Sequence, residues 1–190
     1  MTQKILAFAG SLRRGSLNKK LVRVAADGAR AAGAEVTEID LRDIPMPFYD
    51  GDMEREQGMP PNAKLFKRLL MEHNGVLIST PEYNSAISGV LKNAIDWASR
   101  AESGEAPLVA FKGKVGGVMA ASPGNLGGVR ALVMLRALLS HLGVIVVPTQ
   151  LGIMRANDAF DVSGSLLDQT QRDTVRSIGA EVVHFVRKFG

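Results

Sequence analysis

The feature that most constrains the fold is an apolar run near the N-terminus, followed by a short polar loop and a helical pattern. Residues 5–9 are all apolar and lead into Gly10, which is typical of a strand buried on both faces of a parallel sheet. From Leu17 onward, apolar residues recur at steps of three and four, as along one face of a helix. The sequence therefore predicts a buried strand that leads through a loop into a helix N-terminus.

The loop between this strand and this helix is rich in hydrogen-bond donors. It contains Ser11, Arg13, Ser16 and Asn18. A helix N-terminus has unpaired N–H groups and a partial positive charge, so it favours anions. We interpret the loop as a phosphate site. The alternative is that Ser16 merely caps the helix, which would leave the second serine, the arginine and the asparagine unexplained.

Strand and helix patterns alternate five times along the chain. Further strands are expected at residues 35–40, 75–80, 114–121 and 144–147, and further helices at 60–72, 90–100, 129–142 and 166–189. Residues 43–52 and 151–164 are expected to be irregular. The alternation predicts an α/β fold: a doubly wound, five-stranded parallel sheet with strand order 2-1-3-4-5 and helices on both faces. Residues 1–190 are expected to form one domain.

Two more unusual loops follow the third and fourth predicted strands. In the order 2-1-3-4-5 the first, third and fourth strands lie side by side, so one crevice at their carboxyl ends can hold all three loops. The second loop offers Tyr83 as a flat surface and Asn84 and Ser85 as hydrogen-bonding groups. The third, from Ser122 to Gly128, contains three glycines that permit close approach to a planar ligand. Together the loops indicate a phosphorylated flat heterocycle such as flavin mononucleotide (FMN).

Plainer interpretations of these residues stay open at this point. Tyr83 can be a packing residue, and Glu82 a salt-bridged loop residue rather than an acid catalyst, which is the interpretation we favour. Gly127 and Gly128 can simply permit a tight entry into the next helix. Trp97, on the apolar face of a predicted helix, is expected in the core.

Composition excludes several classes of function. The chain has no cysteine, which excludes thiolate catalysis, including phosphatases with a cysteine in a similar loop, and Cys-ligated metals. Its three histidines lie far apart, so no metal site is expected. A net charge of +4 without a basic block gives no support for nucleic-acid binding. No apolar stretch has the length of a membrane span and no signal pattern begins the chain, so we expect a cytoplasmic protein.

The stretches from Ser11 to Asn18 and from Pro81 to Asn84 carry a resemblance to the NADPH-dependent FMN reductase family of flavodoxin-like proteins, which includes quinone, chromate and azo-dye reductases. The similarity extends from Ile5 to about Leu142. In that family the first motif holds the FMN phosphate and the second holds the isoalloxazine ring. The resemblance therefore implies the following cofactor-binding residues: Ser11, Arg13, Ser16, Leu17 and Asn18 for the phosphate; Pro81, Glu82, Tyr83, Asn84 and Ser85 for the ring; and, less specifically, Ser122 and Gly124.

The resemblance also implies an activity. NADPH, or NADH, is expected to reduce FMN, and a quinone, free flavin, azo compound or metal oxyanion is expected to take its place, with no catalytic side chain required. The alternatives are a flavodoxin-type electron carrier and a regulatory nucleotide-binding domain. No Gly-Lys-Ser/Thr pattern follows the first strand, which argues against a P-loop.

We expect a homodimer or homotetramer. The predicted helix at residues 129–142 has enough leucines on one side to cover the sheet, and Val129, Val133 and Ala137 lie on the other. Such surplus apolar surface often marks an association site. Members of the family are commonly dimers or tetramers, which agrees with this expectation.

Overall fold

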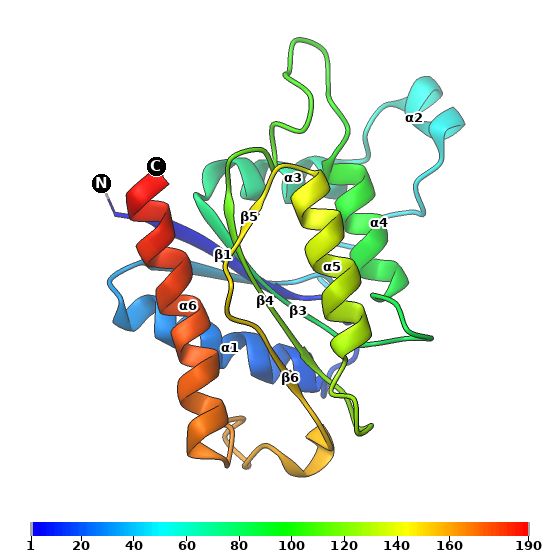
Figure 1. Cartoon of the computed structure of the whole chain (residues 1–190). Helices are drawn as coiled ribbons and strands as arrows, with labels where there is room; N and C mark the ends of the chain where they lie inside the picture. Colours follow the sequence, from blue (N-terminus) through cyan, green and yellow to red (C-terminus); the bar gives the residue numbers. More distant parts are fainter. Residues whose placement is uncertain (1, 190) are drawn as a thin grey trace.

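A parallel sheet forms the centre of the computed structural model, which describes residues 2–189. Its strands lie in the order β2-β1-β3-β4-β5. A sixth strand, β6, also pairs with β4 (Figure 1). Every pair is parallel. The strands are β1 (Lys4–Ala9), β2 (Glu35–Asp40), β3 (Gly75–Thr80), β4 (Val115–Ala121), β5 (Ile145–Val146) and β6 (Leu151–Ile153). The predicted strand order and fold class are therefore confirmed.

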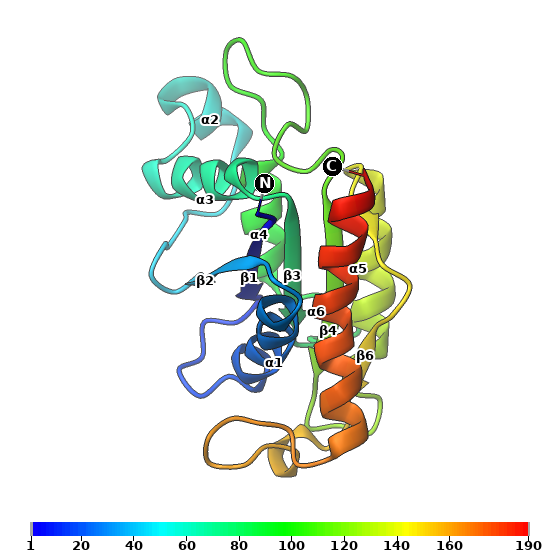
Figure 2. The ribbon, with the colours of Figure 1, turned by 90° about the vertical axis from the view of Figure 1, so that its left-hand side faces the viewer.

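Helices cover both faces of the sheet. One face carries α1 (Leu17–Ala31) and α6 (Gln169–Phe189), and the other carries α3 (Pro61–Glu72), α4 (Gly89–Ala98) and α5 (Val129–His141). In Figure 2, α3 and α6 lie on opposite sides of the strands. All residues of β3 and β4 are buried as a result, as expected for strands covered on both faces.

The two helices on the first face approach each other at backbone distance. A Cβ added to Gly28 would lie 2.0 Å from the carbonyl oxygen of Arg176, and one added to Gly179 would lie 2.0 Å from that of Ala25. Only glycine fits at these two positions, because any side chain would overlap a backbone carbonyl. This contact holds α1 against the C-terminal helix. It thereby also fixes the start of α1, where the predicted phosphate loop ends.

The last predicted strand differs from the structure. The strand expected at residues 144–147 is shortened to β5. A further strand, β6, lies within residues 151–164, which the sequence predicts to be irregular. β5 pairs with the first part of β4 and β6 with its last three residues, so two segments share one edge of the sheet. Pro148 lies between them, and proline has no N–H for the strand ladder, which explains the interruption.

Two further differences lie elsewhere in the chain. A short helix, α2 (Gly51–Gln57), replaces the end of the expected irregular segment, because the Asp50 side chain accepts a hydrogen bond from the Asp52 N–H and caps it. The 3-10 helix η1 (Ala156–Asp158) follows β6. None of the described helices combines the length and the apolar character that a membrane span requires. Trp97 is fully buried, as predicted.

Candidate functional site

The loops after β1, β3 and β4 meet at one small hollow at the carboxyl end of the sheet. Its volume is about 60 Å³, which suits a phosphate group better than a whole nucleotide. The lining residues are Ser11, Arg13, Ser16, Leu17, Asn18, Pro81, Glu82, Tyr83, Ala121, Ser122 and Pro123. Nine of the twelve predicted residues are among them. The other three, Asn84, Ser85 and Gly124, lie in the same loops but outside this lining.

Serine hydroxyls organise the first loop locally. The Ser16 Oγ accepts a hydrogen bond from the Lys19 N–H at 3.4 Å and caps α1, so the capping interpretation of this serine is correct. The Ser11 Oγ accepts one from the Arg13 N–H at 3.4 Å. Both hydroxyls keep a proton to donate, and the N–H groups of Leu17 and Asn18 lie in the first helical turn, where no intrahelical partner exists. Capping and anion binding are therefore compatible in this loop.

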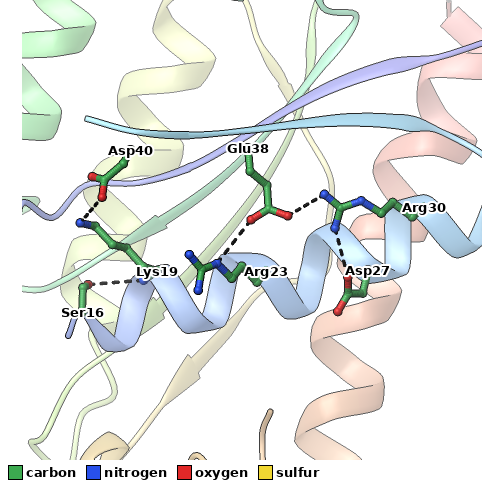
Figure 3. A network of polar contacts seen from close by, with 7 residues as sticks. All are labelled: Ser16, Lys19, Arg23, Asp27, Arg30, Glu38 and Asp40. Atoms are coloured by element: carbon green, nitrogen blue, oxygen red, sulfur yellow. Dashed lines mark hydrogen bonds and ion pairs between the residues drawn. The ribbon is translucent and has the colours of Figure 1, made fainter. Parts of the chain in front are cut away.

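Arg13 is the cation of this hollow that no carboxylate neutralises. Its side chain is exposed, and among residues 2–189 it forms no ion pair. Lys19, one turn into α1, differs: its Nζ lies 2.5 Å from Asp40 of β2, at the left of Figure 3.

The polar network continues along α1 away from the hollow. Glu38 of β2 lies between Arg23, at 3.5 Å, and Arg30, at 2.6 Å, and Arg30 also pairs with Asp27 at 3.1 Å (Figure 3). The carboxylates of the edge strand thus occupy Lys19, Arg23 and Arg30 of α1. At the hollow itself, the positive charge comes from Arg13 and the helix N-terminus.

The Asn18 amide is committed to the protein itself. Its Oδ1 accepts hydrogen bonds from the Ala121 N–H at 2.9 Å and the Ser79 hydroxyl at 2.7 Å, and its Nδ2 donates to the Ala121 carbonyl at 2.9 Å. Asn18 is buried. It therefore ties the ends of β3 and β4 to the start of α1, and its backbone N–H is the group left for a phosphate. Ala121, which sequence reasoning missed, takes part only through its backbone.

The second loop contains a tight two-residue turn. Tyr83 and Ala86 exchange backbone hydrogen bonds of 2.9 and 3.0 Å, and Asn84 and Ser85 between them have φ values of 50° and 67°. Two positive φ values in a two-residue hairpin define a type I′ turn. Residues other than glycine seldom adopt this conformation, and such strain clusters at ligand sites. Tyr83 is 51% exposed, so it is not a core packing residue.

The Glu82 side chain turns toward α5. Its carboxylate accepts hydrogen bonds from the Arg130 N–H at 3.0 Å, the Arg130 Nε at 2.6 Å and the Ala131 N–H at 3.3 Å. Burial acts to raise the pKa of Glu82, but the hydrogen bonds from Arg130 and Ala131 outweigh it and hold the pKa below its usual value. The carboxyl group is thus ionised near neutral pH, as the salt-bridge interpretation predicts.

The third loop is joined to the segment after β6. The Ser122 N–H donates to the Ile153 carbonyl, and the Ala156 N–H donates to the Ser122 carbonyl, both at 3.0 Å. Gly127 has φ +60°, and a Cβ on it would lie 2.8 Å from the Gly152 carbonyl oxygen. This glycine is therefore explained by close backbone packing. Sequence reasoning missed the segment 151–156 because a three-residue strand carries no usable periodicity.

The donor set of this site fits a flavin nucleotide. An unpaired guanidinium, two hydroxyls and free helix N–H groups surround a hollow of phosphate size, and an exposed tyrosine with a left-handed turn lies next to it. The sheet order defines a flavodoxin-like α/β protein, and the position of these loops marks a candidate nucleotide site at the carboxyl ends of β1, β3 and β4.

Comparison with known proteins makes the assignment specific. The model of the NADPH-dependent FMN reductase family matches residues 3–158, and the chain belongs to this family. It is therefore a flavoprotein oxidoreductase, with FMN as cofactor and NAD(P)H as reductant. The resemblance carried by the two loop motifs is thereby confirmed.

The relatives cover nearly the whole chain. An NAD(P)H-dependent FMN reductase of Pseudomonas aeruginosa is 37% identical over 174 residues, which span 91% of this chain and 89% of the relative. A quinone reductase of Escherichia coli is 35% identical, over 90% of this chain and 88% of its own. Among solved structures, the flavoenzyme NAD(P)H:(acceptor) oxidoreductase FerB of Paracoccus denitrificans superposes with a TM-score of 0.83 at 28% identity, and the match covers 100% of both chains.

Proposed function

We propose that this enzyme uses NADPH to reduce a small electron acceptor, with a quinone as the first candidate substrate. Free flavins, azo compounds and metal oxyanions such as chromate are the further candidates. Support for a quinone comes from the relatives, which include the quinone reductase of Escherichia coli and a 2-hydroxy-1,4-benzoquinone reductase of a Burkholderia species, 31% identical over 98% of this chain. Bound FMN supplies the redox chemistry that accepts hydride from the nicotinamide and returns electrons to the acceptor.

The observation that carries the proposal is the meeting of an anion-binding loop and a strained, exposed turn at one hollow. Arg13 would neutralise the phosphate through charge-assisted hydrogen bonds, with the Ser11 and Ser16 hydroxyls and the first N–H groups of α1 as further donors. Tyr83 and the turn at Asn84 and Ser85 would support the ring from one loop, with Ser122 and Gly124 in the other.

Side-chain acid–base catalysis is not part of this proposal. Glu82, the carboxylate of the hollow, is held ionised by its hydrogen bonds from α5. The contribution of the chain is then to bind, orient and partly cover the cofactor, and backbone N–H groups near Asn84 would stabilise negative charge on the reduced ring. Tyr83, Asn84 and Ser85 are exposed, which leaves room for each substrate in turn at one face.

Spectroscopy of the purified protein tests this proposal. Apo-protein titrated with FMN should give a saturable change in the flavin spectrum. NADPH added without oxygen should bleach the bound flavin, and a benzoquinone should restore its colour. A protein that binds no FMN would refute the proposal. A protein that binds FMN but oxidises NADPH no faster than free FMN does would instead be a flavodoxin-type electron carrier.

Steady-state kinetics test the order of events. If NADPH and the quinone use the same ring face in turn, double-reciprocal plots at several quinone concentrations should be parallel, the sign of a ping-pong mechanism. Intersecting lines would mean that both substrates bind at once, and the shared face would then be wrong.

Two coarser features belong to the same proposal. We take residues 1–190 as one domain, since the two large apolar clusters of the core pack on the same sheet. We also place the protein in the cytoplasm, an assignment that rests on the sequence interpretation.

A further inference from the structure

Helix α5 begins without a capping side chain of its own. Its N-cap residue is Gly128, which has φ 86° and offers no side chain to the first-turn N–H groups. A Cβ at Gly128 would lie 2.7 Å from the Ala120 Cβ of β4, so the helix start is too close to the sheet for a larger residue. The usual cap, a serine, threonine or aspartate at this position, is therefore excluded by packing.

The missing cap is supplied by the second loop of the site. The Glu82 carboxylate accepts the N–H groups of Arg130 and Ala131, at 3.0 and 3.3 Å, in the first turn of α5. The Arg130 side chain adds a hydrogen bond of 2.6 Å from its Nε. The Glu82 side chain is only 7% exposed. Both of its oxygens are thus occupied, and the partial positive charge of the helix N-terminus stabilises the carboxylate.

This contact joins two loops that the proposed function places around the flavin ring. Glu82 directly precedes Tyr83 and the strained turn, and α5 directly follows the loop from Ser122 to Gly128. The segments are far apart in sequence, and among the hydrogen bonds of residues 2–189 those of Glu82 are the ones that link them.

We propose that Glu82 is a positioning residue, which fixes the loop after β3 against the start of α5 and so sets the geometry of the ring site. This inference rests on the proposed function, because that function places the ring between these two loops. Glu82 then acts on the cofactor through Tyr83 and its turn, and not through a contact of its own carboxylate with the ring.

Three variants of Glu82 separate the effects of its side-chain length, its negative charge and its hydrogen bonds to α5. Glu82→Ala removes the cap. Glu82→Asp keeps the charge on a shorter side chain that does not reach α5. Glu82→Gln keeps the length and one acceptor oxygen for the N–H groups of Arg130 and Ala131. The readouts are the dissociation constant of FMN from apo-protein titration and the visible spectrum of the bound flavin, neither of which requires turnover.

Positioning through the cap predicts a defined order of effects. Glu82→Ala should weaken FMN binding about tenfold, which corresponds to about 1.4 kcal/mol and is the usual size of a lost helix cap. Glu82→Asp should behave like Glu82→Ala, and Glu82→Gln should recover most of the affinity and the parent spectrum.

Glu54→Ala is the matched control. Glu54 of α2 is a partly buried carboxylate that is also paired with an arginine, Arg100, at 2.9 Å, and its pKa is also lowered, with the hydrogen bond from Arg100 as the main cause. It does not line the hollow. Glu54→Ala should therefore leave both FMN affinity and the flavin spectrum unchanged, even if it lowers the melting temperature.

Several results would overturn the inference. Parent-like affinity and spectrum in Glu82→Ala, or in Glu82→Asp should the alanine variant not fold, would show that the contact does not position the ring site. A Glu82→Gln variant as weak as Glu82→Ala would show that the charge acts and not the cap. Equal losses in Glu54→Ala would indicate general loosening. A parent protein that binds no FMN would instead refute the proposed function itself.

Discussion

Arg13 is the residue on which phosphate binding should depend most. Arg13 lines the hollow, whereas Lys19 and Arg130 at the starts of the two adjacent helices are occupied by Asp40 and Glu82. Arg13→Ala should therefore weaken FMN binding by about 1.5–3 kcal/mol, the range for a hydrogen bond to a charged group. Titration of apo-protein with FMN measures this loss.

Arg14→Ala is the control for this prediction, because Arg14 is an exposed neighbour that does not line the hollow. It should bind FMN like the parent. Unchanged affinity in the double variant Arg13→Ala with Ser11→Ala would mean that the phosphate binds elsewhere.

At the residue scale, sequence patterns located the site but not the direction of every side chain. Motif positions next to a strand end are local information, and most of the predicted residues do line the hollow. The partners of Asn18 and Glu82 are not local: Ala121 is 103 residues from Asn18, and Arg130 is 48 residues from Glu82. The sequence around Asn18 or Glu82 does not specify a partner so far along the chain. The folded structure is therefore needed to show that both side chains hold loops together.

At the scale of elements, the contact between α1 and α6 should be the least tolerant of added volume. Gly179→Ala would place a Cβ 2.0 Å from the Ala25 carbonyl oxygen, so the two helices would have to separate. Overpacking of this kind costs about 1–3 kcal/mol, which exceeds the gain of about 1 kcal/mol from the higher helix propensity of alanine. Urea unfolding should show a net loss of stability.

Gly89→Ala provides the comparison, since Gly89 starts α4 and a Cβ there meets nothing within 4 Å. This variant should be as stable as the parent or slightly more stable. A Gly179→Ala protein as stable as Gly89→Ala would contradict the backbone contact between α1 and α6.

Long elements with clear periodicity were predictable, and short ones were not. The second strand has the predicted bounds, Glu35–Asp40, and the predicted helix at residues 129–142 differs from α5 by one residue. β6 was missed because its three residues form a strand only where β4 leaves an edge free beyond Pro148. α2 was missed although Asp50 and Gly58, typical capping residues, mark its two ends.

Across the whole molecule, α5 leaves an apolar strip uncovered. Val129, Val133 and Met134 are 43%, 63% and 44% exposed, while Leu132 and Leu135 on the other side are buried. The alternative to association is that the C-terminal helix or the stretch 151–164 covers this side within one chain. Neither does, since α6 packs on α1 at the opposite face of the sheet and the three side chains remain exposed. An exposed apolar strip of this kind is where we expect copies of the chain to associate.

The last prediction is that this strip, defined by Val129, Val133 and Met134, joins copies of the chain into a dimer or tetramer. Val133→Glu would bury an unpaired charge in the contact, at a cost of several kcal/mol, so light scattering should give a smaller species than the parent. Val162→Glu is the control, because Val162 is a fully exposed valine outside α5, and this variant should keep the parent mass. A parent that is monomeric at micromolar concentration would refute the interface, and equal masses for the parent and Val133→Glu would place it on another face.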